Sequence, residues 1–469
     1  MDDFQKNHTP QDAGESAVIA AISTAQAPGG IGIVRLSGTR AREVADRVFR
    51  SPRGKKIADA PGYTALYGHA YSMEGERLDE VIALVFAGPA SFTGEDVVEF
   101  SCHGGLTILK GVLRAVLAAG ARAAGPGEFT RRAFLHGKMD LTQAESVMQL
   151  ISAQGSQAAR IALSGHDGAL AKRIAGIRQK LLDGAAHLSA WADYPEEEIP
   201  MVDPAALRCT LGSAQEEIDR LLSQFDAGKA ICEGVDTVLV GRPNVGKSTL
   251  MNLLAGCERS IVTQFAGTTR DVVEETVLLG DIALRIADTA GIRETEDPVE
   301  SIGVGKARDR MRRAQLVLAV FDSSQELAQE DRDLVEELRQ VPAVAVVNKS
   351  DLETKIDIKY IERNFQQIVF LSARSGEGLA ALEQAVAQVL HTASLHPAEG
   401  ILFTERQRDA AKRAGQGIEE ALLALDSGMT LDAVTVSLEG AIGALLELTG
   451  ERATEAVVDQ VFAQFCVGK

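Results

Sequence analysis

The stretch from Val235 to Thr249 constrains the fold of this chain more than any other. An apolar, β-branched run ends at a glycine, the sequence Gly-x-x-x-x-Gly-Lys-Ser follows, and leucines then continue at helical spacing. This order of strand, loop and helix predicts a phosphate-binding loop. Gly241 and Gly246 permit backbone conformations that a Cβ would disfavour. The N–H groups of the loop and the N-terminus of the helix are then expected to face an anion.

Two side chains of this loop have separate expected roles. Lys247 is expected to lie along the β and γ phosphates, and Ser248 to hold Mg²⁺ through its hydroxyl. The residues of the loop predicted to bind nucleotide are Asn244, Val245, Gly246, Lys247, Ser248 and Thr249.

Two further motifs fit the γ-phosphate and the magnesium ion. The segment Gly267–Asp271 lies in a polar loop before a strand, and its Thr269 is the candidate to close over the γ-phosphate and complete the Mg²⁺ coordination. Asp288-Thr289-Ala290-Gly291 ends the next predicted strand. Asp288 is expected to reach the Mg²⁺ shell through water, and the Gly291 N–H to sense the γ-phosphate.

The last two motifs select guanine. Asp351, in Asn348-Lys349-Ser350-Asp351, can accept from both N–H groups of the guanine edge, and adenine lacks that pair of donors. Ser372-Ala373-Arg374 ends the last strand and can donate a backbone N–H to guanine O6. Five motifs in this order predict GTP rather than ATP. The remaining predicted GTP-binding residues are Thr263, Thr268, Thr269, Asp288, Thr289, Ala290, Gly291, Asn348, Lys349, Asp351, Ser372, Ala373 and Arg374.

One position departs from the pattern of many GTPases. A glutamine that orients the attacking water often follows Asp-x-x-Gly, and here that position is Ile292, which cannot hydrogen-bond water. Fast hydrolysis therefore needs another residue to position the nucleophile and another positive charge for the transition state. Spacing alone does not choose among the downstream carboxylates Glu294, Glu296, Asp297 and Glu300.

Length, charge and cysteine content set limits on the class of protein. At 469 residues the chain exceeds one ordinary core. Its net charge of −18 argues against broad electrostatic attachment to nucleic acid or anionic membrane. The net charge does not exclude a local basic patch. No apolar run is long enough to span a bilayer, and the polar start lacks the order of a signal peptide. We therefore expect a cytoplasmic protein that does not enter membranes.

The five cysteines are scattered, with no Cys-x-x-Cys pair, so neither a disulfide framework nor a zinc site is predicted. Four of them are expected to be buried or half-buried thiols, and Cys466 is considered separately.

The periodicity of the chain predicts a multidomain α/β protein. A P-loop GTPase domain with a doubly wound, mostly parallel sheet is inserted in an α-helical domain, and a mixed α+β N-terminal domain precedes both. The predicted parts are a flexible tail (1–16), the N-terminal domain (17–137), a first helical part (138–233), the GTPase domain (234–390) and a second helical part (391–469). The strands expected in the GTPase domain are Asp236–Val240, Val272–Leu279, Ile282–Ala287, Leu316–Phe321, Ala343–Val347 and Ile368–Leu371.

The chain resembles the bacterial and organellar tRNA-modification GTPase family MnmE, also called TrmE, over nearly everything after the N-terminal tail. The GTPase motifs are shared with many families, whereas the N-terminal motifs and the ending are much more specific. The motifs that carry the resemblance are Gly32–Gly38, Ser91–Asp96, His103–Gly105, Pro126–Thr130, Arg132–Leu135, the GTPase set and Phe465-Cys466-Val467-Gly468-Lys469.

This resemblance implies a homodimer whose N-terminal domain binds 5-formyl- or 5,10-methylene-tetrahydrofolate and forms the dimer. It also implies a flavoprotein partner, MnmG (GidA), which carries FAD and joins this chain in a hetero-oligomer. Together the two proteins would install an aminomethyl or carboxymethylaminomethyl group at C5 of the wobble uridine, position 34, of certain tRNAs, while GTP is hydrolysed to GDP and phosphate.

The resemblance also assigns roles to individual residues. Arg35, Glu99, Lys138 and Lys469 match the folate pocket, where cations and a carboxylate suit the folate oxygens and the pterin N–H groups. Cys466 is either a packed thiol or a reactive group near the folate, and both interpretations stay open.

In this family, dimerisation of the G domains activates hydrolysis, and K⁺ replaces an arginine finger. Glu300 matches the catalytic residue that orients the attacking water through a second water. The residues that match the K⁺ site are Asn244, Thr263, Phe265 and Thr268.

Two sequence departures accompany these matches. Gln264-Phe265-Ala266 is bulkier than the family's common Asp-Ile/Val-Ala, but a backbone carbonyl is the expected K⁺ ligand there. The segment Ala25–Gly29 lacks one of the two prolines that the family often has.

The alternative is a regulatory or ribosome-assembly GTPase, with flanking domains that only bind RNA or protein. The N-terminal motifs and the Cys-Val-Gly-Lys ending distinguish the two hypotheses.

Overall fold

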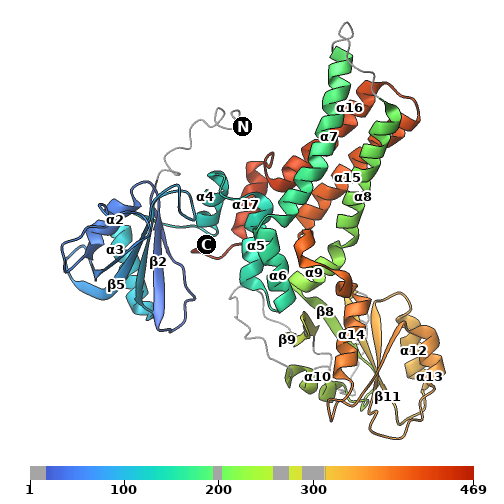
Figure 1. Cartoon of the computed structure of the whole chain (residues 1–469). Helices are drawn as coiled ribbons and strands as arrows, with labels where there is room; N and C mark the ends of the chain where they lie inside the picture. Colours follow the sequence, from blue (N-terminus) through green and yellow to red (C-terminus); the bar gives the residue numbers. More distant parts are fainter. Residues whose placement is uncertain (1–16, 194–202, 257–273, 288–310, 312) are drawn as a thin grey trace, which may run out of the picture. The chain divides into compact units, whose positions relative to one another are not determined.

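Figure 1 shows a computed structural model of the chain, which describes residues 17–193, 203–256, 274–287, 311 and 313–469. Contacts divide the chain into two compact units. Unit 1 comprises residues up to Met148 together with Thr449–Lys469, and unit 2 comprises Gln149–Leu448. Among the described residues, no helix is long and apolar enough to cross a membrane.

Unit 1 contains a seven-stranded sheet in the order β3-β4-β5-β6-β2-β1-β7, and all its pairs are antiparallel except β1 with β7. The strands are β1 (Ile19–Ile22), β2 (Ile31–Ser37), β3 (Phe49–Arg50), β4 (Thr64–Tyr71), β5 (Arg77–Phe86), β6 (Val97–His103) and β7 (Arg122–Ala123). Helices α2 (Ala41–Val48) and α3 (Leu106–Ala118) pack on the sheet through one shared core.

The alternation of side chains along β2 and β6 decides which residues meet on the other face of the sheet. Val34 and Phe100 are fully buried in the core that the sheet shares with α2 and α3. Successive side chains on a strand point to opposite faces, so Arg35 and Glu99 lie on the face away from these helices. They are also direct partners in the antiparallel register.

The end of the chain belongs to unit 1. Helices α4 (Glu128–Leu135), α5 (Leu141–Ser152) and α17 (Glu455–Ala463) bury Leu141, Phe462 and Phe465 in one cluster. Val467 also forms a β-bridge with Pro126. The sequence-based division instead counted all of residues 391–469 as helical domain, and the domain boundaries stay a prediction.

Unit 2 contains a six-stranded sheet in the order β13-β12-β11-β8-β10-β9, in which only β9 is antiparallel to its neighbour. The strands are β8 (Val235–Val240), β9 (Glu274–Leu279), β10 (Ile282–Ala287), β11 (Leu316–Asp322), β12 (Ala343–Asn348) and β13 (Gln367–Leu371). Every residue of β11 is buried, as expected for a central strand covered on both faces. The helices of this part are α10 (Lys247–Gly256), α12 (Gln329–Glu337), α13 (Ile358–Asn364) and α14 (Leu379–Val389).

The other helices of unit 2 are formed by residues that precede the strands of this sheet in the sequence and by residues that follow them. They are α6 (Ser156–His166), α7 (Ala169–Asp193), α8 (Pro204–Ser223), α9 (Phe225–Glu233), α15 (Glu405–Asp426) and α16 (Leu431–Thr449), with the short 3₁₀ helices η2 (Thr392–Ser394) and η3 (Pro397–Glu399). Helices α7, α8, α15 and α16 share one core that includes Ile177, Leu211 and Ala414. Alanines and glycines let α15 approach its neighbours closely, since a Cβ on Gly417 would lie 3.0 Å from that of Ala441.

Candidate functional site

The phosphate-binding loop runs from the end of β8 to the start of α10. Gly241 (φ +145°) and Gly246 (φ +100°) both have backbone angles that favour glycine. A Cβ on Gly241 would lie 2.3 Å from the carbonyl oxygen of Val320. The Lys247 ammonium donates to the carbonyl oxygens of Gly241 (2.6 Å) and Arg242 (2.7 Å), so this cation lies against the loop at the start of the helix. This arrangement fits the predicted role of the loop in holding phosphates.

Asn348, at the end of β12, joins the loop to the rest of the site. Its Nδ2 donates to the Val245 carbonyl (2.9 Å), and its Oδ1 accepts from the Ala373 N–H (2.9 Å). The side chain is buried, and a Cβ on Gly246 would lie 2.2 Å from its Nδ2. Asn348 therefore fixes the phosphate loop relative to the segment that follows β13.

Lys349 makes a second connection. Its ammonium donates to the Asn244 carbonyl (2.9 Å) and to the Asp322 carboxylate (2.5 Å). Asp322 is buried, which alone would raise its pKa, but hydrogen bonds from Lys349 and Ser324 outweigh burial and hold the pKa below the usual value. Asp322 was not among the residues predicted from the sequence, although its place at the end of a buried strand, on the edge where the other motifs lie, was a signal.

Asp351 lies beside the loop after β13. A hydrogen bond from the Ser372 side chain is the main cause that lowers its pKa, and the charges of Arg374 and Lys349 act in the same direction. The carboxylate is exposed and ionised at neutral pH, as an acceptor for two N–H groups must be. The residues predicted to bind guanine thus gather at the carboxyl ends of β12 and β13.

Several predicted residues lie outside the described part of the chain, and their predictions stay untested. They are Thr263, Phe265, Thr268, Thr269, Asp288, Thr289, Ala290, Gly291, Ile292 and Glu300.

A second candidate site in unit 1 contains three of the four predicted folate residues. The Arg35 guanidinium donates to the Glu99 carboxylate at 2.7 Å, and both side chains are mostly buried. Burial first, and then the charge of Arg35, lowers the pKa of Lys469, so this ammonium is close to the pair. The Lys469 carbonyl accepts from the Phe129 N–H (3.2 Å), which fixes the last residue beside α4.

Aromatic rings border this cluster. The Arg35 guanidinium lies 5.8 Å from the ring centre of Phe92 and 5.6 Å from that of Phe129, within the range of cation–π attraction. The predicted fourth member, Lys138, instead donates to the Pro89 carbonyl (3.0 Å) and so contacts the 89–94 loop that also carries Phe92. The site therefore offers cations, one carboxylate and aromatic surface to a ligand.

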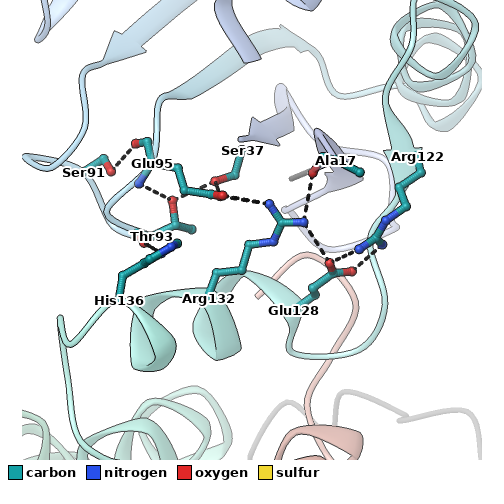
Figure 2. Close-up of polar contacts among 9 residues, drawn as sticks. All are labelled: Ala17, Ser37, Ser91, Thr93, Glu95, Arg122, Glu128, Arg132 and His136. Carbon is teal, nitrogen blue, oxygen red and sulfur yellow. Dashed lines mark hydrogen bonds and ion pairs between the residues drawn. The ribbon is translucent and has the colours of Figure 1, made fainter. Parts of the chain in front are cut away.

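A buried polar network, shown in Figure 2, holds helix α4 in place beside this site. Arg132 donates from one nitrogen to both oxygens of Glu95 (3.0 Å each), and from the other to the Ala17 carbonyl (2.9 Å) and to Glu128 (3.2 Å). Glu95 also accepts from the Ser37 hydroxyl (2.7 Å). The network thus links α4 to strand β2 through side chains of the motifs that carry the family resemblance, for which the sequence predicted no individual role.

Glu128 completes the network with Arg122, whose guanidinium contacts both of its oxygens. Burial would raise the pKa of Glu128, but hydrogen bonds from Arg122 and the Gly125 N–H outweigh burial and lower it. The carboxylate therefore stays ionised at neutral pH.

The cysteines differ in environment. Burial raises the pKa of the Cys102 and Cys232 thiols to about 12 in each case, so both stay protonated. Cys209 is exposed, so the expectation that it would be buried or half-buried is wrong; it lies on α8 away from the helical core. Cys257 lies outside the described residues. Cys466 is half-buried and close to Lys469 in sequence, and nothing in the structure decides between a packed and a reactive thiol. Within the described ranges no group of three or more His, Cys, Asp or Glu residues could hold a metal.

The β8–α10 loop and the residues predicted to bind the base are typical of a P-loop GTPase. Two family models match the chain: the GTP-binding protein TrmE N-terminus over residues 18–138, and the MnmE helical domain over residues 141–466. The chain therefore belongs to the MnmE (TrmE) family of tRNA modification GTPases and is a GTP-hydrolysing enzyme of this class.

Curated relatives agree over nearly their whole length. The tRNA modification GTPase MnmE of Geobacillus kaustophilus is 43% identical over 97% of this chain and 100% of the relative. The protein of that name from Symbiobacterium thermophilum is 43% identical over 96% of this chain and 99% of its own. Among solved structures, the G domain of the T. maritima FeoB iron transporter is 26% identical over 33% of this chain and 98% of its own, at a TM-score of 0.26, which is too low to carry an argument.

Proposed function

We propose that this chain is a K⁺-dependent GTPase that acts with the flavoprotein MnmG to install a (carboxymethyl)aminomethyl group at C5 of the wobble uridine, position 34, of certain tRNAs. The observation that carries the proposal is the cluster of Arg35, Glu99 and Lys469. GTP hydrolysis alone needs no such site in a separate unit, whereas one-carbon transfer needs a site for the carbon donor.

The chemistry of the cluster supports 5-formyl- or 5,10-methylene-tetrahydrofolate as that donor. When bound, the folate supplies the one-carbon unit. Glu99 suits the N–H groups of the pterin, and the cations Arg35, Lys469 and Lys138 suit the formyl oxygen or the glutamate carboxylates. The ring of Phe92, which is 37% exposed, adds apolar area for a flat ring. FAD would belong to the partner.

In the GTPase part, Ser248 and Thr269 would hold Mg²⁺, and Glu300 would orient the attacking water. Asn244 has a left-handed backbone (φ +63°), and its carbonyl is bound by Lys349. Its exposed side chain is then free to turn toward a monovalent cation, together with Thr263, Phe265 and Thr268. This geometry supports K⁺ in place of an arginine finger, and one-residue changes can test it.

Hydrolysis of GTP is therefore expected to be faster in KCl than in NaCl at equal ionic strength, because the larger cation fits a site built from carbonyl and amide oxygens. Glu300→Ala should slow hydrolysis about 100-fold, a typical loss for a group that acts in proton transfer or water positioning, while GTP affinity stays nearly unchanged. Steady-state phosphate release and nucleotide titration measure the two effects. Equal rates in the two salts would contradict the K⁺ assignment, and an equal loss of binding would make Glu300 a structural residue.

Dimerisation through unit 1 is part of the proposal. Tyr67 on β4 and Ile82 on β5 are 52% and 46% exposed. They are register partners on the sheet face opposite α2 and α3. A second copy of the chain would cover this apolar surface. We also propose the domain order given above, with the GTPase domain between two parts of one helical domain, and a cytoplasmic location.

Nucleoside analysis of tRNA from a deletion strain tests the function. The modified wobble uridines should disappear and return with the wild-type gene. Unchanged wobble uridines would favour a regulatory GTPase instead. Binding of 5-formyl-tetrahydrofolate to the purified chain, lost in Glu99→Gln but kept in Glu80→Gln on the neighbouring strand, separates the folate role from the rest.

A further inference from the structure

Residues 40–56 hold an unusual concentration of positive charge. This stretch contains seven Lys or Arg and two Asp or Glu, in a chain whose net charge is −18, and no other 17-residue stretch has so large a positive excess. It covers α2, the edge strand β3 and the loop that follows. In an acidic protein, binding of a polyanion depends on such a local positive surface.

The same stretch surrounds a hollow of about 400 Å³. Its lining contains four cations and one carboxylate: Asp46, Arg47, Phe49, Arg50, Ser51, Gly54, Lys55 and Lys56. The volume is in the range of small-ligand sites. The hollow lies at the β3 edge of the sheet, whereas Arg35 and Glu99 are on β2 and β6, with β4 and β5 between.

The single carboxylate is occupied in holding the loop. Asp46 accepts from the backbone N–H groups of Ile57 (2.6 Å) and Ala58 (3.1 Å), and Ile57 is fully buried in the core. A turn between Ser51 and Gly54 (3.0 Å) shapes the loop in between. The loop is therefore a fixed structure, and its carboxylate faces backbone amides rather than the cations.

Two of the cations are held in place. Arg47 donates to the Ala119 carbonyl at the end of α3 (2.8 Å), and the Arg50 guanidinium lies 4.4 Å from the ring centre of Tyr71. Lys55 and Lys56 are exposed, and no salt bridge with a described residue involves them. Two oriented guanidinium groups beside two exposed ammonium groups suit phosphate oxygens, which accept from both kinds of donor.

We propose that this hollow binds the phosphate backbone of tRNA. The inference rests on the proposed function, which makes tRNA the substrate. Exposed Arg40 and Arg53 extend the positive surface beyond the hollow, so a chain of phosphates fits it better than one small anion. Contacts of this type fix the position of an RNA but do not read its sequence. The hollow would thus hold a part of the tRNA common to all substrates.

The test compares the full-length double variant Lys55→Glu/Lys56→Glu with the wild type. Binding of an unmodified tRNA transcript is measured by fluorescence anisotropy at several KCl concentrations. The variant should bind about tenfold more weakly at low salt, and the slope of log Kd against log [KCl] should fall by about two, one for each phosphate that the two lysines no longer bind. GTP hydrolysis and folate binding should not change.

The matched control is Lys110→Glu/Arg114→Glu, which makes the same charge change at two exposed positions of α3 outside the hollow. Equal weakening in both variants would overturn the proposal, because net charge alone would then explain the effect. Wild-type affinity and slope in Lys55→Glu/Lys56→Glu would also overturn it. A third contrary result would be that inorganic phosphate binds in the hollow at millimolar concentration but leaves the tRNA affinity unchanged. The hollow would then be a site for small anions. The nucleoside analysis above tests the substrate itself independently.

Discussion

Replacing Arg132 by methionine is expected to destabilise unit 1 by about 3–5 kcal/mol, because it leaves the buried Glu95 carboxylate without its partner. Arg132 and Glu95 side chains are only 6% and 8% exposed. The change also removes the donors to Ala17 and Glu128. Hydrogen exchange of the α4 and β2 amides in the intact chain measures the loss, since local opening of these elements becomes easier.

The neighbouring residue provides the control. Arg131 is on the same helix, but its partners Glu455 and Asp459 are 67% and 60% exposed, at 3.9 and 3.5 Å. Arg131→Met should therefore cost under about 1 kcal/mol. If both variants lose the same stability, the buried pair has no special role. The double variant Arg132→Met/Glu95→Gln should recover part of the loss, because no unpaired buried charge is left.

The pH dependence gives a second measurement on the same variant. Because the pKa of Glu128 is lowered from its usual 4.5 in the folded chain, its ionised form contributes stability above that value, and the contribution is lost as the pH falls through the folded-state pKa. Hydrogen bonds from Arg122 and the Gly125 N–H lower this pKa most, and the charge of Arg132 adds a smaller part. The difference between wild type and Arg132→Met should therefore shrink slightly as the pH is lowered below about 4.5. A constant difference would mean that Glu128 does not depend on Arg132 for its charge.

This network also matters for the candidate folate site. The Phe129 N–H on α4 holds the Lys469 carbonyl, and the Phe129 ring borders Arg35. When Arg132 no longer fixes α4, these contacts loosen together. Arg132→Met is thus expected to weaken 5-formyl-tetrahydrofolate binding without touching the ligand, and Arg131→Met is not.

The sequence predicted the sheet of the GTPase domain well, because buried parallel strands are continuous apolar runs. Strand β10 has the predicted bounds, and β8, β11, β12 and β13 differ by one residue at one end. In unit 1 no strand was predicted over residues 64–71, which form β4. Gly68, Ala65 and His69 weaken its apolar alternation, and its place in the sheet comes from pairing with β5.

In the candidate sites, too, the features set by local sequence were predicted, and the contacts between residues distant in sequence were not. The loop from Gly241 to Ser248 could be read from the sequence because its conformation depends on nearby glycines and a helix start. The contacts of Asp322 with Lys349 and of Glu95 with Arg132 join residues 27 and 37 positions apart. No local sequence pattern predicts such contacts, so they could be identified only in the folded structure.

Asp351→Asn is expected to lower GTP affinity by about 100-fold or more, because two hydrogen bonds from guanine to a charged acceptor are removed, each worth about 1.5–3 kcal/mol. The wild-type carboxylate is ionised at neutral pH, since the Ser372 hydrogen bond lowers its pKa. Asparagine has one acceptor and one donor instead. It therefore suits xanthine, which carries a carbonyl where guanine has its amino group.

Titration with fluorescent GTP and XTP measures this switch, and XTP should bind the variant more tightly than GTP. Glu353→Gln is the matched control, because it removes one exposed negative charge two residues away and should leave GTP affinity unchanged. The loop itself should stay intact in Asp351→Asn, since Asn348 holds it through Val245 and Ala373. XTP binding by the variant therefore separates a weakened interaction with the base from a disrupted fold. A variant that binds neither nucleotide would show that Asp351 supports the fold. A variant that still prefers GTP would show that another residue selects guanine.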